Sequence, residues 1–249
     1  MKKILSVFLI IILSTTHASA RSFLDNRGRV EVLMYHRICT DKSCKNSYCI
    51  SSELFENDLK YLKAHGYESV FASSLADGDF RGKRIVVITF DDGYKSDIEL
   101  AVPLLEKYGF CASFYIFGGA VGTENYLTED DIRLMSSKSY IEIGNHTYML
   151  HKYAPSTLNL LYSNPLNADK IFSDFDKNSA FLKSLTGKEV ITATYPNGEY
   201  STEVDLMLKS NGIKTTFSTE PFSFFKILPD KPAGRKTRSG DTDIESLLK

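Results

Sequence analysis

The chain has 249 residues, of which 43% are hydrophobic, and its 30 basic and 31 acidic side chains leave a formal net charge of −1. A chain of this length can bury a substantial core within one domain. The near balance of charge argues against nucleic acid as the main partner.

Residues 1–20 have the features of a secretory signal. Two lysines precede an apolar run over residues 4–13, and the small residues Ala18-Ser19-Ala20 form a cleavage site. The apolar run is too short to span a bilayer comfortably, so we expect no stable membrane span, with an uncleaved anchor as the alternative. We therefore predict a cleaved leader and one domain over residues 21–249, in the bacterial periplasm or outside the cell.

Three of the four cysteines, Cys39, Cys44 and Cys49, lie in one polar loop. In an oxidising compartment these three favour a short disulfide within the loop, although the pairing stays open. A structural zinc site is the weaker alternative, because their even spacing matches no familiar ligand pattern. Cys111 lies in an apolar run and is predicted to be a small core residue.

Strand-like and helix-like segments alternate along the chain. Strands are expected at residues 30–35, 69–71, 84–90, 111–117, 140–144, 190–195 and 214–218, and helices at 52–65, 95–108, 128–137, 168–185 and 202–210. Repeated strand–helix units predict a parallel sheet covered by helices. About seven units in one domain favour a distorted or incomplete (β/α)7 barrel over an open sheet, and no glycine-rich nucleotide motif follows the first strand.

Unusual polar residues follow the predicted strands at their carboxyl ends, where (β/α) barrels place their chemistry. They are His36, Asp91, Asp92, Asn145, His146 and the turn Tyr195-Pro196-Asn197-Gly198. We expect these side chains to meet at one end of the barrel.

Asp91 and Asp92 directly follow the apolar run Ile85-Val86-Val87-Ile88. Burying such carboxylates costs several kcal/mol each unless they are paired or bind a cation. His146 and His151 follow a later strand, and two imidazoles with one carboxylate could bind a metal while leaving positions open for water and substrate. A hydrogen-bonded histidine pair is the alternative, but the aspartate pair favours a metal site.

These motifs resemble those of the polysaccharide deacetylases, carbohydrate esterase family four. The resemblance rests on Thr89-Phe90-Asp91-Asp92-Gly93, on the segment from His146 to His151 and on the Tyr-Pro-Asn-Gly turn, and extends over residues 33–242. The five-residue step between the histidines looks like the poly-N-acetylglucosamine deacetylase subgroup. The resemblance implies a secreted hydrolase that removes N-acetyl groups from an amino-sugar polysaccharide, either a poly-N-acetylglucosamine-like glycan or peptidoglycan.

The resemblance also implies roles for single residues. It assigns Asp92, His146 and His151 to a divalent metal, zinc first with cobalt or nickel as alternatives, and Asp91 to the general base. Zinc can lower the pKa of bound water from 15.7 to about 7, and a neighbouring carboxylate can take the released proton. The backbone N–H of Asn197 would stabilise the oxyanion.

The sequence departs from the family pattern at two residues that assist catalysis. The segment Ile191-Thr192-Ala193-Thr194 lacks the usual arginine beside the catalytic aspartate, and no histidine follows His151. Arg235 or Arg238 could replace the arginine. His36 could be a proton donor, a substrate contact or a structural residue. A catalytically weak glycan-binding descendant is therefore the main alternative function, and a hydrolase of another amide or ester is a distant third.

The chain has no tryptophan, so any sugar-stacking surface must come from its 14 tyrosines and 16 phenylalanines. The tyrosines considered for this role are Tyr94, Tyr148, Tyr153 and Tyr195. The sequence leaves the glycan, the metal and the oligomeric state open.

Overall fold

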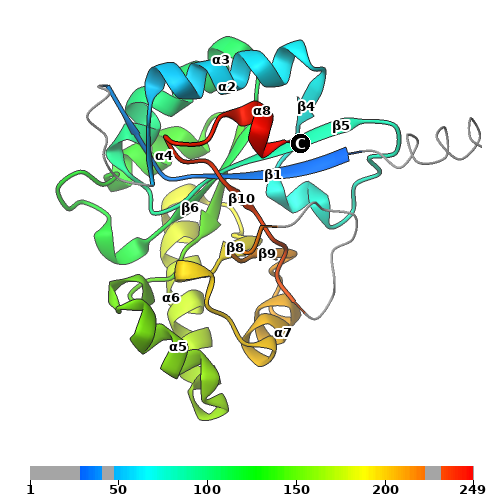
Figure 1. Ribbon diagram of the computed structural model, residues 1–249. Coiled ribbons are helices and arrows are strands. Elements are labelled where there is room, and N and C mark those ends of the chain that lie inside the picture. Colours follow the sequence, from blue (N-terminus) through cyan, green and yellow to red (C-terminus); the bar gives the residue numbers. More distant parts are fainter. Residues whose placement is uncertain (1–28, 41–47, 222–230, 249) are drawn as a thin grey trace, which may run out of the picture.

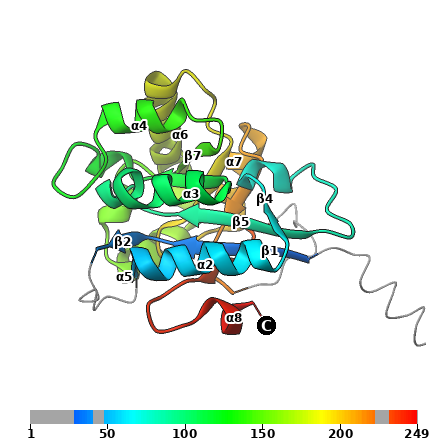
Figure 2. The ribbon, with the colours of Figure 1, turned by 90° about the horizontal axis from the view of Figure 1, so that it is seen from above.

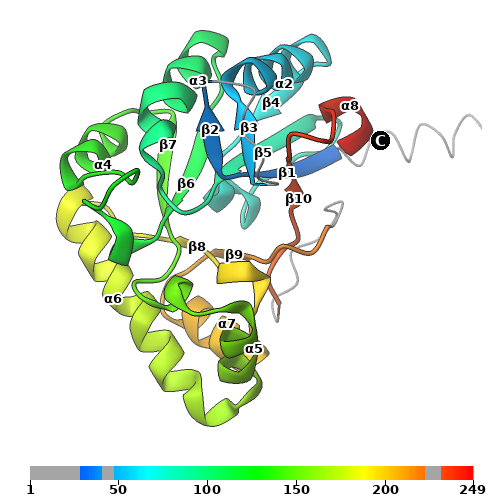
Figure 3. The same ribbon diagram turned by 60° about the vertical axis from the view of Figure 1, so that its left-hand side comes forward.

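The computed structural model describes residues 29–40, 48–221 and 231–248. The predicted leader lies outside these residues, as does Cys44. In the described part of the chain, parallel strands form one strongly curved sheet, and the longer helices lie around its outside (Figure 1, Figure 3). The distorted or incomplete (β/α)7 barrel predicted from the sequence is confirmed.

The main sheet has the strand order β10-β1-β5-β6-β7-β8-β9, and β4 pairs with β5 off this path. Its strands are β1 (Arg29–Tyr35), β4 (Tyr67–Ser69), β5 (Arg84–Phe90), β6 (Ala112–Ile116), β7 (Ile141–Asn145), β8 (Thr192–Thr194), β9 (Thr215–Phe217) and β10 (Lys236–Thr237). The amino-terminal half of β5 pairs with β4, and its last two residues pair with β6. The sheet is therefore splayed open between β5 and β6 at its amino end.

The two edges of the sheet approach each other through Ala233. Its N–H donates to the carbonyl of Thr216 at 2.8 Å, and its carbonyl accepts from the N–H of Ser218 at 2.9 Å. Because Ala233 precedes β10 by only a few residues, this short parallel bridge links β9 towards β10 and nearly closes the barrel.

The helices are α2 (Ser52–Ala64), α3 (Val102–Tyr108), α4 (Glu129–Ser136), α5 (Pro155–Ser163), α6 (Ala168–Thr186), α7 (Thr202–Ser210) and α8 (Ile244–Leu247). The short α8 lies beside α2 (Figure 2). No helix in the described ranges is long and apolar enough to cross a membrane.

Most predicted elements are confirmed, and β5 and α7 have the predicted bounds. The strand predicted at residues 69–71 is found two residues earlier, as β4, which ends at Ser69; a 3₁₀ turn follows at Ala72–Leu75. The helix predicted at residues 95–108 begins with a π-type turn, Asp97–Ala101, which continues into α3. The prediction missed β10, α5, α8 and a small second sheet of β2 (Arg37–Cys39) and β3 (Cys49–Ser51).

The described cysteines divide into a bonded pair and a free thiol. Cys39 and Cys49 are both disulfide-bonded and Cys111 is free. Cys44 could form a disulfide with only one of them and would leave the other without a partner. Cys39 and Cys49 are therefore bonded to each other. The predicted loop disulfide is confirmed, and these two cysteines are not zinc ligands.

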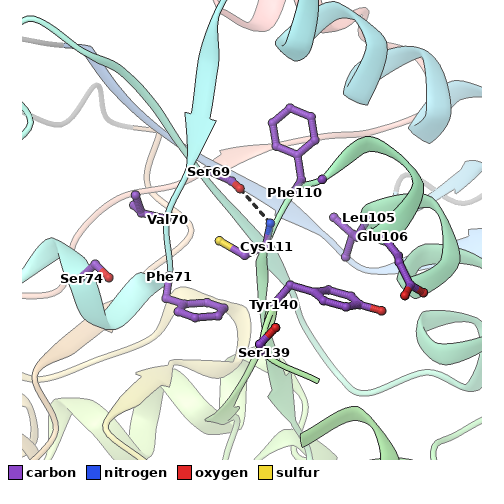
Figure 4. Close-up of a pocket in the computed structure, with 11 residues that line it drawn as sticks. Ser69, Val70, Phe71, Ser74, Leu105, Glu106, Phe110, Cys111, Ser139 and Tyr140 are labelled. Atoms are coloured by element: carbon purple, nitrogen blue, oxygen red, sulfur yellow. Dashed lines mark hydrogen bonds between the residues drawn. The ribbon is translucent and has the colours of Figure 1, made fainter. Parts of the chain in front are cut away.

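Cys111 is not the core residue that the sequence predicts. It is only partly buried and lines a pocket of about 600 Å³ at the amino ends of β6 and β7 (Figure 4). Its N–H donates to the hydroxyl of Ser69 at 2.8 Å (Figure 4), and Phe71, Phe110 and Tyr140 also line the pocket. Cys111 directly precedes β6, and its side chain lines this pocket rather than the barrel core.

Candidate metal and catalytic site

A cavity of about 770 Å³ opens at the carboxyl ends of β1, β5, β7 and β8; we call it the site cavity. Of the polar residues that the sequence predicts to meet, His36, Asp91, Asp92, His146 and Asn197 lie in its lining together with His151, whereas Asn145 does not. The strand-end geometry of a parallel barrel accounts for this convergence, since these residues directly follow a strand or lie in the segment after it.

Asp92 lies between the two histidines. Its Oδ1 is 3.0 Å from Nε2 of His151 and 3.3 Å from Nε2 of His146. Asp92 adopts a left-handed backbone conformation, with φ of 79°, which is unusual for a residue other than glycine. Strained backbone of this kind persists where the surrounding structure holds it in place, and it is often found at functional sites.

His146 is oriented by the end of β8. Its Nδ1 lies 3.1 Å from the carbonyl oxygen of Thr194 and 2.5 Å from the hydroxyl oxygen of the same residue, and its Nε2 is directed towards Asp92. Thr194 is the second partner that metal-binding histidines commonly have.

These three residues fit a divalent cation. One ligand atom from each of Asp92, His146 and His151 lies within 4.8 Å of the others. Oδ1 of Asp92 is buried and makes no hydrogen bond of proper geometry with another described residue, although both imidazoles are near. Burial opposes ionisation of Asp92, but the two histidines hold its pKa well below the usual value. An ionised carboxylate and two imidazoles suit zinc.

Asn145 at the end of β7 shapes the loop that carries the histidines. Its side-chain oxygen accepts from the N–H of Thr147 at 2.8 Å and from the amide of Asn178 at 2.9 Å. Thr147 itself has φ of 68°. Asn145 therefore supports the site from behind rather than facing the substrate.

Asp174 on α6 is a supporting residue that sequence reasoning missed. Its carboxylate accepts the N–H groups of Tyr148 at 2.7 Å and Met149 at 3.0 Å, immediately before the segment that carries His151. The partly buried position of an aspartate in an amphipathic helix was the available signal, but its partners are distant in sequence.

Asp91 is held by Arg235. Both residues are almost completely buried, and the guanidinium donates to both carboxylate oxygens, at 2.7 and 2.6 Å. Arg235 also donates to the carbonyl of Ser218 and the hydroxyl of Thr89. Burial would raise the pKa of Asp91, but Arg235 and the nearby histidines outweigh it and lower that pKa.

Arg238, the other arginine considered for Asp91, lies elsewhere. It donates to Asp58 of α2 at 2.7 and 3.0 Å and is also buried. The Tyr35 hydroxyl donates to the same carboxylate at 3.1 Å. Arg238 therefore attaches the C-terminal segment to the outside of the barrel.

His36 and Asn197 both line the site cavity. Burial lowers the pKa of His36 more than Asp91 and Asp92 raise it. Asn197 has φ of 55°, in the turn that follows β8. Of the tyrosines considered for sugar stacking, Tyr94 and Tyr195 line the cavity, but Tyr195 is fully buried.

The chain is similar in sequence and fold to known polysaccharide deacetylases. The family model for polysaccharide deacetylase matches residues 79–216. A poly-beta-1,6-N-acetyl-D-glucosamine N-deacetylase of Staphylococcus aureus (strain N315) is 27% identical over 247 residues, which cover 87% of this chain and 84% of that protein. YxkH of Bacillus subtilis (strain 168) is 28% identical over 198 residues, covering 78% of this chain and 66% of YxkH.

Two solved structures are similar over most of their length. IcaB from Ammonifex degensii has a TM-score of 0.73 and 26% identity, covering 86% of this chain and 93% of that chain. A de-N-acetylase from Aggregatibacter actinomycetemcomitans has a TM-score of 0.74 and 22% identity, covering 88% of this chain and 98% of that chain, and shares the fold.

Proposed function

Because this chain belongs to the polysaccharide deacetylase family, carbohydrate esterase family four, we propose that it is a secreted, metal-dependent N-deacetylase of a poly-N-acetylglucosamine-like glycan. The observation that carries the proposal is that two neighbouring aspartates have different partners. Asp92 lies between His146 and His151, whereas Asp91 forms an ion pair with Arg235. The predicted leader over residues 1–20 supports secretion.

The proposed roles of the two aspartates follow from their partners. A divalent cation held by Asp92, His146 and His151, with zinc the first choice and cobalt or nickel as alternatives, would polarise the acetamide carbonyl and make water more acidic. Asp91 accepts its hydrogen bonds from Arg235 rather than from His146 or His151, and Arg235 keeps it ionised. It would accept the proton of the water that attacks the carbonyl carbon.

Asn197 and His36 have proposed supporting roles in the same cavity. The backbone N–H of Asn197 would donate to the oxyanion as it forms, a contribution that is typically worth about 10²–10³ in rate. His36 has a lowered pKa and is neutral near pH 7. We therefore favour a role in which it forms a hydrogen bond with the substrate over a role as proton donor. The proton taken up by Asp91 would then pass to the nitrogen as the C–N bond breaks, which releases acetate and leaves a free amine on the sugar.

Experiment can distinguish this proposal from two alternative functions. Peptidoglycan would use the same site on another glycan. A glycan-binding descendant would explain two absences, the arginine in the segment before Tyr195 and a histidine after His151. The pairing of Arg235 with Asp91 argues against the first of these reasons and leaves the second.

The test is acetate release from N-acetylglucosamine oligomers and from peptidoglycan, with and without a chelator and with zinc restored. We expect the oligomers to be deacetylated and the chelator to stop the reaction. Asp92→Ala should lose bound metal, whereas Asp91→Asn should keep the metal and lose turnover. Strong glycan binding without acetate release in any metal would favour the binding protein, and full activity in both variants would contradict the assigned site.

A further inference from the structure

Tyr48 is an exposed aromatic side chain at the rim of the site cavity. It is 53% exposed, and its ring centroid lies 4.8 Å from that of His36. Among the large hydrophobic side chains that are exposed in the described ranges, Tyr48 is the one that lines this cavity. Tyr153 is similarly exposed, at 42%, but does not contribute to the lining.

The backbone of Tyr48 is fixed at its carbonyl and at the residue that follows it. Its carbonyl accepts the N–H of Arg37 at 3.1 Å, where β2 pairs with β3. The next residue, Cys49, is buried and disulfide-bonded to Cys39 at the end of β2. A ring presented from a cross-linked pair of strands has little backbone freedom to lose when a ligand binds.

The C-terminal segment adds uncharged hydroxyl groups to the same cavity. Thr237, Ser239 and Thr242 all line it, and the hydroxyls of Ser239 and Thr242 lie 3.3 Å apart. Arg238, between the first two, is anchored on Asp58 and also donates to the carbonyls of Ser239 and Thr242. An aromatic face together with uncharged hydroxyls suits a neutral, hydroxyl-rich ring, because the ring offers both C–H and O–H groups.

We propose that Tyr48, positioned by the Cys39–Cys49 disulfide, stacks on a saccharide ring next to the one that is deacetylated and thereby selects polymer over monomer. This inference rests on the proposed function and concerns substrate positioning, with no part in bond cleavage. The disulfide acts through Tyr48, so Cys39 and Cys49 are positioning residues.

The test compares kcat and KM on N-acetylglucosamine oligomers of increasing length with those on a small chromogenic acetyl ester. We expect Tyr48→Ala to raise KM for long oligomers about tenfold, because one aromatic contact is lost. Both kcat and the hydrolysis of the ester should change little. Tyr48→Phe keeps the ring and should behave as wild type. Tyr153→Ala, an exposed tyrosine outside the cavity lining, is the matched control and should leave the length dependence unchanged.

The disulfide is tested with the double variant Cys39→Ser/Cys49→Ser, which should raise KM for long oligomers in the same direction as Tyr48→Ala. If that variant is poorly folded, calorimetric binding of an oligomer to Asp91→Asn with and without Tyr48→Ala decides the question. Equal KM and equal oligomer affinity with and without the Tyr48 ring would overturn the inference. A wild-type protein that releases no acetate from any substrate would instead overturn the proposed function.

Discussion

The guanidinium of Arg235 donates to both carboxylate oxygens of Asp91, at 2.7 and 2.6 Å, although the two residues are 144 positions apart. Arg235 lies just before β10 and Asp91 just after β5, so the pair joins the last part of the barrel to the proposed base. A buried pair of this kind is costly to break, and its two parallel hydrogen bonds fix the plane of the carboxylate.

We expect Arg235→Lys to lower kcat/KM for an acetylated oligomer at least tenfold, since a lysine cannot keep both hydrogen bonds. Burial of Asp91 opposes its ionisation, and Arg235 is the main group that offsets this. With a weaker partner the pKa of Asp91 rises, so the acidic limb of the pH profile of kcat/KM should move to higher pH. Arg81→Lys, which changes an exposed arginine paired with Asp79, is the control. An acidic limb that stays in place would contradict the role of Arg235.

Asp174 provides a second prediction, on metal affinity. Because it accepts the N–H groups of Tyr148 and Met149, Asp174→Ala should loosen the segment that carries His151. We expect zinc affinity, measured by competition with a chelating dye, to fall about tenfold. Asp176→Ala changes an exposed aspartate on the same helix and should leave the affinity unchanged. Equal zinc affinity in the two variants would show that Asp174 does not support the site.

The regular elements were predictable because their sequence periods are strong. The apolar run of β5 is buried on both faces, and its predicted bounds match the structure. The short strands β2, β3 and β10 have too few residues for a period to show, and their pairing depends on distant parts of the chain. Only the fold therefore brings Tyr48 to the rim of the site cavity.

The choice between Arg235 and Arg238 shows where sequence reasoning about the site stops. Successive side chains of an extended segment point to opposite sides, so two residues that are three positions apart face opposite ways. One of the two arginines had to point into the barrel, and the sequence alone could not say which. Pairing of β10 with β1 sets the register, which places Arg235 on Asp91 and Arg238 on Asp58.

Arg238 leads to a prediction on stability. Removing one partner of a buried ion pair leaves the other charge uncompensated, so Arg238→Ala should lower the free energy of unfolding by about 3–5 kcal/mol. Tyr35→Phe, which removes one hydrogen bond to Asp58, should cost about 1 kcal/mol. Arg133→Ala breaks exposed pairs with Glu129 and Asp130 and should cost at most about 1 kcal/mol. Urea unfolding measures all three; a similar loss for Arg238→Ala and Arg133→Ala would contradict the prediction.

Asp97, in the π-type turn before α3, is a buried carboxyl group whose pKa should affect stability. It is fully buried, and neither carboxylate oxygen has a hydrogen-bond partner among the described residues. Burial, reinforced by the charge of Asp92, raises the pKa of Asp97 well above its usual value. The folded state therefore keeps a proton that the unfolded chain releases above about pH 3.9.

Folding that retains a proton is disfavoured as the pH rises, by about 1.4 kcal/mol per pH unit, between the ordinary pKa and the raised one. Asp97→Asn has no proton to release, so its stability relative to wild type should increase as the pH rises above the ordinary aspartate pKa of about 3.9. Thermal unfolding of both proteins in chelator measures this difference, in which the titration of all other groups cancels. Asp205→Asn is the control, because that buried carboxylate is paired with Lys209 and should lose stability on neutralisation. A constant difference between Asp97→Asn and wild type across this range would show that Asp97 is ionised in the folded protein.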